Sequence, residues 1–484
     1  MNLHHIFENS SPGRLFFRAA IPGAIGMSAI SIYFMFEGMF IGRVLGETAF
    51  AALNLALPFI MLNTNLADLI GVGSSVPISV SLGQKDKKQA NNIFTCASIM
   101  IFASAAIVGL LMYFAAPYII NMMKAEGELA ENAVTFLRIA SLLSPFVTIL
   151  FAADNYLRIC GKTRASMLIN LMMAFVCLAL QILFVIVLDW GVIGCGIASN
   201  LGMAICGFIS FFPFVIGKME LRFCKPKFSM AMIKQIVACG APNFLSTTAG
   251  RLTSIVLNTL LLRLGGSIAV SIYGILMSVD GWVQSIFYGV CDALQPAISY
   301  NWGAGKVKRV NAIAKYCFAA SAVVSTSIGI LMYFFADKIT FLYLGEVTAD
   351  VLKLAVFALG LFCINYLFRW GSFATQSFML AIERPKYASL ISICDGYDLP
   401  PACSLACMAR RTGADSTLAE CARDNGSRRR SGVYLYDKVQ KGLKRTKNSM
   451  KKAACENRRF YYGKFQLCAG LRQTPINSGV PLPV

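Results

Sequence analysis

Arg43-Val44-Leu45-Gly46-Glu47-Thr48-Ala49 occurs again 220 positions later, as Arg263-Leu264-Gly265-Gly266-Ser267-Ile268-Ala269. Outward from this stretch the two copies correspond without a gap, over residues 14–115 and 234–335. Both copies are largely apolar, which indicates a duplicated bundle of membrane helices. Duplicated halves that bind a ligand at their interface are typical of secondary transporters, so the repeat favours a transporter.

The composition agrees with a membrane protein. The chain is 57% hydrophobic and 14% charged, with a mean hydropathy of +0.63, whereas soluble domains are about 25% charged. The apolar runs are continuous rather than alternating, so they predict helices and not barrel strands. The first run has no small-residue cleavage site and is expected to be a retained span. Ten spans are predicted, at residues 15–42, 50–76, 93–123, 132–156, 165–188, 191–217, 231–263, 267–296, 311–335 and 351–382.

These spans predict an all-α polytopic membrane protein with two pseudo-symmetric lobes. The amino-terminal lobe, 1–217, has six spans, whereas the second lobe, 218–393, has only four and is incomplete. The formal charge of +20 does not indicate nucleic-acid binding, because the basic residues alternate by loop. They follow the second, fourth, sixth, eighth and tenth spans, and the intervening loops are acidic or nearly neutral. Cytoplasmic loops collect Lys and Arg, so a multi-pass protein of the plasma (inner) membrane with a cytoplasmic amino terminus is expected.

Residues 394–484 have a different character. They hold 17 Lys or Arg, 7 Asp or Glu and 6 of the 16 cysteines, with no run long enough to span a membrane. Cys403 and Cys407 do not predict a metal site, because His4 and His5 lie at the other end of the chain. One interpretation is a disordered basic tail.

The other interpretation is a shifted reading frame. Asp395-Gly396-Tyr397-Asp398-Leu399-Pro400 can be encoded as GATGGTTATGATCTTCCC. Without its first base this reads Met-Val-Met-Ile-Phe, which suits the start of an eleventh span. The hypothesis is that a frameshift replaced the last two helices. The remaining ten spans are not expected to support transport, because the second lobe would expose faces built to pack on partners.

Several ordered motifs resemble the multidrug and toxic compound extrusion (MATE) family over residues 12–393. They are Phe36-Glu37-Gly38-Met39-Phe40-Ile41-Gly42-Arg43, then Ala51-Ala52-Leu53-Asn54 with Pro58, then Ser81-Leu82-Gly83-Gln84-Lys85, and Gln295-Pro296-Ala297-Ile298-Ser299-Tyr300-Asn301-Trp302-Gly303. The resemblance implies twelve helices in two lobes around a V-shaped cleft that opens alternately to each side. It also implies export of cationic or amphipathic drugs in exchange for H+ or Na+.

Glu37 is the candidate for cation or proton coupling, because it stands where the family often has an aspartate. A carboxylate within a span costs about 2.5–3.5 kcal/mol on insertion scales and is usually functional. The alternative is a structural Glu37 paired with a buried Arg or a hydroxyl. The family often has a second aspartate on the fifth span, where this chain has Gln181. The uncharged Gln181 argues against a two-carboxylate site, and the longer Glu37 favours H+ over Na+.

Four residues are candidates for contact with a substrate: Asp68, Asp280, Trp282 and Asn54. Asp68 and Asp280 would attract a cation, and Trp282 could stack on a flat one. Alternatively, the two aspartates make helix-kink or inter-helix hydrogen bonds. Asp154 is expected to pair with Arg158 or with loop lysines, and Arg251 and Arg369 either neutralise Asp280 or help to close a gate.

Two alternative functions remain open. A lipid-linked oligosaccharide flippase of the same superfamily would need cationic residues in the cleft, for which Arg138, Arg251 and Arg369 are available. A non-transporting membrane protein would use the basic tail for recruitment. An enzyme is not expected, since no nucleophile motif or phosphate-binding loop occurs. The expected partners are the lipid bilayer and small-molecule substrates, with no cofactor, no metal and no nucleic acid. A monomer is the expected oligomeric state.

Overall fold

The computed structural model describes residues 7, 10–123, 125–292, 294–344 and 349–396, and within these residues the regular structure is entirely helical. The chain divides into two compact units, Met1–Cys407 and Met408–Val484. The second unit lies outside the described residues, and so does the predicted tail from residue 397 on. The first six helices of the first unit are α1 (Pro12–Val44), α2 (Glu47–Gly83), α3 (Lys87–Met122), α4 (Gly127–Ile159), α5 (Thr163–Gln181) and α6 (Gly191–Val215), with a π-helical turn, η2 (Ile182–Val187), after α5.

The second copy begins with α7 (Met230–Cys291) and α8 (Gln295–Gly303), and continues through α9 (Val307–Phe334), α10 (Ala336–Leu344), α11 (Ala349–Ala381) and α12 (Pro385–Gly396). Seven of the described helices, α1 to α4, α5 with η2, α6 and α9, are long and apolar enough to cross a membrane. The other three predicted spans correspond to the two halves of α7 and to α11. The sequence prediction of an all-α membrane protein is therefore confirmed.

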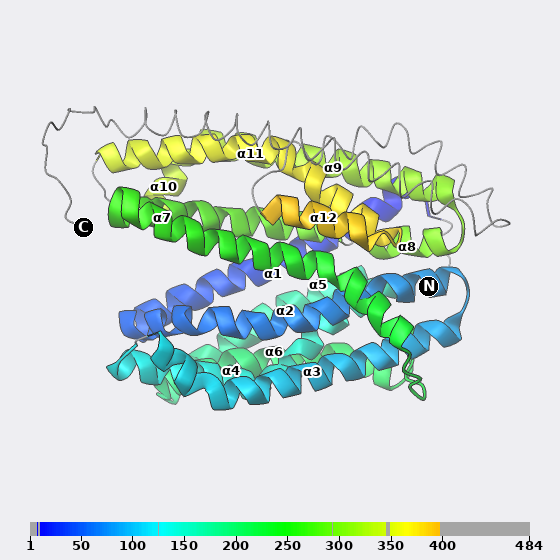
Figure 1. Cartoon of the computed structure of the whole chain (residues 1–484), viewed down its shortest axis with the longest axis horizontal. Coiled ribbons are helices and arrows are strands. Elements are labelled where there is room, and N and C mark those ends of the chain that lie inside the picture. Colours follow the sequence, from blue (N-terminus) through cyan, green and yellow to red (C-terminus); the bar gives the residue numbers. More distant parts are fainter. Residues whose placement is uncertain (1–6, 8–9, 124, 293, 345–348, 397–484) are drawn as a thin grey trace, which may run out of the picture. The chain divides into compact units, whose positions relative to one another are not determined.

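Local sequence explains where these helices begin. Pro12 occupies the first turn of α1, where its missing N–H costs no hydrogen bond, and the Ser11 hydroxyl accepts from the Arg14 amide. The Asp86 carboxylate caps α3 by accepting from the Gln89 amide at 2.9 Å. In the first lobe α4 packs against α2, α3 and α6 (Figure 1), and it is the most deeply buried of the seven candidate spans. Its position makes α4 the centre of that lobe.

The long helix α7 (green in Figure 1) takes the place of two predicted spans, 231–263 and 267–296. Asn243 and Tyr288 lie in this one helix, and a straight helix would separate them by about 68 Å. Instead the Tyr288 hydroxyl donates to Asn243 Oδ1 at 3.5 Å. The chain therefore reverses direction between these two residues while its helical hydrogen bonding continues. The two predicted spans therefore correspond to two arms of one helix, and no separate loop divides them.

One other boundary differs between the copies. The helix α2 is continuous to Gly83, but its counterpart ends at Cys291 and resumes as α8. Pro296 in the first turn of α8 takes the place of Val76 in α2, but α2 stays helical through Pro58 and Pro77, so a proline alone does not explain the break. Beyond α11, α12 begins at Pro385, 222 positions after Thr163 at the start of α5. The helix α12 therefore occupies the place in the repeat that α5 has in the first copy.

The two copies contact each other through glycines that are themselves repeat mates. A Cβ atom added to Gly83 would overlap the Tyr300 carbonyl oxygen, and one added to Gly303 would overlap the Val80 carbonyl oxygen. Gly83 matches Gly303 in the repeat, and Val80 matches Tyr300. The crossing of α2 and α8 is thus reciprocal, which supports two lobes related by pseudo-symmetry.

Candidate functional site

The α1 helix places a tyrosine and a carboxylate on the same face. Tyr33 and Glu37 are four residues apart, so their side chains are neighbours along the helix. The Tyr33 hydroxyl donates to Glu37 Oε1 at 3.1 Å. Tyr33 is buried, with 3% of its surface exposed, and it packs among Met173, Cys177 and Met203. The carboxylate is therefore held beside an apolar cluster.

Two further side chains reach Glu37 from other helices. Gln181, the last residue of α5, lies where the backbone changes to the π-helical turn η2. Its Nε2 donates to Glu37 Oε1 at 3.2 Å and to Ser199 Oγ at 2.9 Å. Ser199, on α6, donates a short hydrogen bond to the same Glu37 oxygen. One carboxylate oxygen thus joins α1, α5 and α6.

The electrostatics of this cluster come from Glu37 alone, because Tyr33, Gln181 and Ser199 are neutral donors. Among the described residues, no Lys or Arg forms an ion pair with Glu37. Burial disfavours the charged carboxylate, whereas hydrogen bonds from three donors stabilise it. A group balanced in this way can take up a proton without first breaking a salt bridge. The sequence analysis left open that Glu37 pairs with a hydroxyl, and the structure shows hydroxyl partners in Tyr33 and Ser199. Ser199 was not identified from the sequence.

The structure does not join the predicted substrate-contacting residues to the Glu37 cluster. Asn54 is exposed and donates to the Phe50 carbonyl of its own helix at 2.9 Å. Asp68 is half-buried on α2, and within the described residues its carboxylate forms no hydrogen bond or ion pair. Trp282 on α7 is 39% exposed.

Asp280 lies on the same arm of α7 as Trp282 and has a definite partner. It forms a short ion pair with Arg369 of α11, and both side chains are nearly buried, at 12% and 13% exposure. The Arg369 guanidinium also lies over the Phe373 ring, 5.7 Å from its centre. Of the two roles that the sequence left open for Arg369, the structure places it against Asp280. The side chain of Arg251 is outside the described residues.

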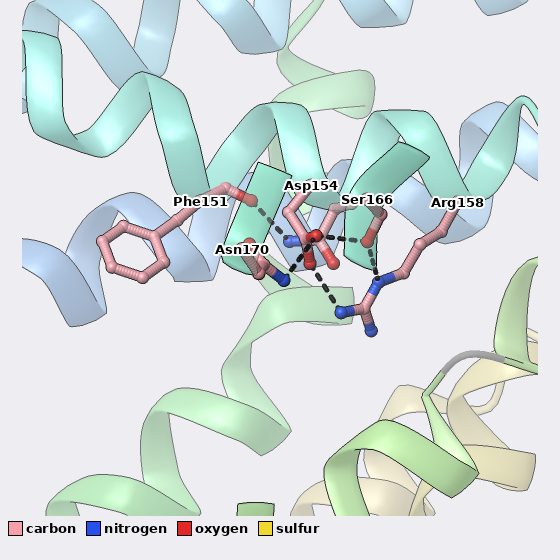
Figure 2. A network of polar contacts seen from close by, with 6 residues as sticks. Phe151, Asp154, Arg158, Ser166 and Asn170 are labelled. Carbon is pink, nitrogen blue, oxygen red and sulfur yellow. Dashed lines mark hydrogen bonds and ion pairs between the residues drawn. The ribbon is translucent and has the colours of Figure 1, made fainter. Parts of the chain in front are cut away.

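A second buried polar network surrounds Asp154 on α4 (Figure 2). Arg158 Nη2 lies 2.6 Å from Asp154 Oδ2, which confirms the predicted pair. From α5, Ser166 donates a short hydrogen bond to Asp154 Oδ1, and Asn170 Nδ2 donates to it at 3.2 Å. Arg158 Nε donates back to Ser166 Oγ at 3.3 Å. Because its charges are paired and its carboxylate is saturated with donors, this network fixes α4 against α5 rather than offering a free charge.

Comparison with known proteins connects this geometry to a family. The family model described as MatE matches residues 22–184 and 242–395, which is more than half of the chain. The second match ends where the composition changes. Among curated proteins, the chain is 23% identical over 401 residues to the multidrug export protein MepA of Staphylococcus saprophyticus, covering 82% of this chain and 88% of that protein. It is 25% identical over 400 residues to MepA of Staphylococcus haemolyticus, covering 82% and 87%.

Solved structures show the same fold. The chain matches a crystal structure of a MATE protein in complex with MaL6 with a TM-score of 0.79 and 18% identity, over 86% of this chain and 98% of that one. It also matches the outward-facing conformation of a multidrug resistance MATE family transporter of the MOP superfamily, with a TM-score of 0.77, 18% identity and the same two coverages. At these identities the likeness establishes the two-lobe helical fold alone.

Proposed function

Because the chain belongs to the MatE family, whose members are multi-pass membrane transporters, we propose that the protein, with its last two helices restored, exports cationic or amphipathic compounds in exchange for H+, with Glu37 as the coupling residue. The curated relatives named above are multidrug export proteins, which supports the substrate class. The proposed setting is the plasma (inner) membrane with a cytoplasmic amino terminus, supported by the basic residues that follow every second span.

The observation that carries this proposal is the convergence of three neutral donors on one carboxylate oxygen. Ionised Glu37 accepts from Tyr33, Gln181 and Ser199 together, and so it ties α1 to α5 and α6. Protonation weakens all three hydrogen bonds at once, because the charge that strengthens them disappears. If α1 changes position when they weaken, the proton shifts the balance between the two conformations of the lobe. A substrate that prefers one of these conformations is then coupled to the proton.

The same contacts favour H+ over Na+. Tyr33, Gln181 and Ser199 present hydrogen atoms to Glu37, whereas a bound Na+ would need oxygen lone pairs directed at a common point. A proton requires only the carboxylate. The amide of Gln181 could supply its oxygen only by turning over, which would give up its bonds to Glu37 and Ser199. The neutral Gln181 also leaves Glu37 as the single charge of the cluster.

Asp68 is the residue proposed to attract a cationic substrate. It is a half-buried carboxylate with no described ion pair, whereas Asp280 is neutralised by Arg369. The flippase alternative is weaker, because two of its three cationic residues are already engaged. Arg138 lies over the Tyr113 ring at 5.4 Å, and Arg369 holds Asp280. The described part of the chain therefore matches a cationic ligand better than a pyrophosphate.

The proposal is tested by binding of a fluorescent lipophilic cation to the purified chain between pH 5 and 8. Antiport predicts that the dye and the proton compete, so dye affinity should rise with pH and binding should release protons. Glu37→Gln should reduce the pH dependence of the affinity and leave only the contribution of other carboxylates such as Asp68. Asp68→Asn should weaken dye binding, most strongly at the highest pH. Glu128→Gln is the matched control, because Glu128 lies in the exposed first turn of α4. Unchanged pH dependence in Glu37→Gln would refute the coupling role. Replacing K+ with Na+ tests the ion, because a Na+ site would make dye affinity depend on Na+ at constant pH.

A further inference from the structure

Phe7 and Ser10, which precede α1, bind the opposite lobe. Phe7 is buried, with 5% of its surface exposed, and its ring lies 5.5 Å from the ring of Tyr300 on α8. The Phe7 carbonyl accepts from Asn301 Nδ2 at 3.2 Å and from Arg309 Nε at 2.8 Å. Arg309 also donates a short hydrogen bond to the Ser10 carbonyl. Asn301 and Arg309 both belong to the second lobe, although Phe7 and Ser10 lead into α1 of the first.

The connection between the lobes makes a matching set of contacts on α3. Asn92 Oδ1 accepts from the Lys227 amide at 2.8 Å, and Asn92 Nδ2 donates to the Lys227 carbonyl at 3.0 Å. The Arg222 amide donates to Asn91 Oδ1 at 3.0 Å, and the Cys224 amide donates to Thr95 Oγ1 at 3.1 Å. This segment leads directly into α7, the first helix of the second lobe, yet it binds the first lobe.

The two docking places are related by the repeat. The amino ends of α3 and α9 correspond, with Asn91 matching Asn311, and α1 corresponds to the first arm of α7. In each lobe, the segment that precedes the first helix therefore binds at or beside the third helix of the other lobe. The side chains are not shared, because Gln89 stands where the second copy has Arg309. The two segments therefore bind at equivalent places, although different side chains hold them.

We propose that these segments, called here the amino-terminal strap (Phe7 and Ser10) and the linker strap (Arg222 to Lys227), hold the two lobes together at this end of the bundle and must detach before the lobes separate there. The connections from these straps to the helices that follow are short. Only Ser11 lies between Ser10 and the first residue of α1, and two residues separate Lys227 from Met230 of α7. At about 3.6 Å for each residue, these connections span at most about 7 and 11 Å.

Close contacts between the lobes lie at the same end. The virtual Cβ of Gly13, in the first turn of α1, is 3.3 Å from the Tyr316 ring of α9. The reciprocal crossing of Gly83 and Gly303 lies next to Tyr300 and Asn301, which hold the amino-terminal strap. A separation of the lobes by more than several ångströms would therefore have to break the Arg309 contacts with Phe7 and Ser10. The strap acts as a short tether across the interface, and its release is a separate step from any proton uptake at Glu37.

Hydrogen exchange of the purified full chain, read by mass spectrometry, tests this proposal. The double variant Phe7→Ala with Arg309→Gln should increase opening at this end by about 10- to 100-fold, the loss expected for hydrogen bonds from a charged donor. Faster exchange is expected in residues 80–90 and 222–228, which do not touch the amino-terminal strap. Lys308→Gln is the matched control, since Lys308 is an exposed neighbour of Arg309. Faster exchange confined to residues 7–13 and 300–309 would overturn the proposal.

A second variant keeps every docking contact and changes only the length of the connection between the amino-terminal strap and α1. Six Gly/Ser residues inserted between Ser10 and Ser11 lengthen the tether without removing Phe7, Asn301 or Arg309. The proposal expects the same remote increase in exchange from this insertion, while the peptide that contains Phe7 stays protected. If the inserted chain keeps Phe7 protected and residues 80–90 exchange as in the parent, the tether does not restrain the lobes and the proposal fails.

Discussion

The ion pair between Asp280 and Arg369 gives a prediction whose size follows from burial. Both side chains are about seven-eighths buried. Removing one partner of a buried pair leaves an uncompensated charge and typically costs about 3–5 kcal/mol. Arg369→Ala should therefore lower the free energy of unfolding by about that amount. Asp280→Asn combined with Arg369→Gln removes both charges and should recover at least half of the loss. An SDS unfolding titration in detergent micelles, followed by circular dichroism, measures both.

An exposed pair provides the control for this measurement. Lys87 and Glu220 lie 3.1 Å apart, but their side chains are 69% and 29% exposed. Exposed pairs contribute about 0–1 kcal/mol, so Lys87→Ala should have little effect. Arg369→Lys keeps the charge but loses the planar group over Phe373, and should cost about 1 kcal/mol. If Arg369→Ala costs no more than Lys87→Ala, the argument from burial is refuted.

Three further predictions concern the second lobe and the end of the match. Burial raises the pKa of Glu383, in the loop after α11, above its ordinary value, and the hydrogen bond from Gln235 opposes the shift. Stability should therefore fall as pH rises from about 4.3 through the folded-state pKa, and thermal unfolding at several pH values should show a smaller pH dependence in Glu383→Gln. Gly303→Ala should lower the free energy of unfolding by about 1–3 kcal/mol, because its Cβ would overlap the Val80 carbonyl. The control is Gly281→Ala, whose Cβ would meet open space and which should not destabilise the protein in the same SDS titration. Resequencing the codons for Ser392 to Pro400 should reveal a missing or extra base, and the corrected chain, unlike this one, should export dye from cells; an intact frame and tryptic peptides from residues 397–484 would contradict this.

The helices could be predicted because the bilayer makes long apolar runs conspicuous. Each of the ten runs appears as a helix or a helix arm, and the resemblance that rested on the ordered motifs is confirmed. The reversal of α7 without a helix break could not be predicted, since Gly265-Gly266 and the charge at Arg263 read as a loop. Nor could the docking of Phe7 on Arg309, because nothing in either local sequence indicates a contact across 302 positions.

The site was predictable to different degrees. Glu37 stood out as a carboxylate in an apolar run, and Gln181 through its place in the family pattern. Tyr33 could have been found, because a spacing of four residues on a helix places it against Glu37. Ser199 could not, since a small hydroxyl on α6 has no distinguishing neighbours in the sequence. The choice of Arg369 as the partner of Asp280 also needed coordinates, because Arg251 was an equally available cation.

The reciprocal crossing of α2 and α8 has the form of a dimer interface. In a twofold homodimer, the patch that residue i uses to meet residue j is also the patch that j uses to meet i. Gly83 with Tyr300, and Gly303 with Val80, satisfy this relation within one chain. A half-length ancestor would have carried both sides of the contact and could have assembled by pairing with itself. Fusion of two such halves leaves each free to change, and the two copies now differ at the coupling position, where Leu257 stands opposite Glu37.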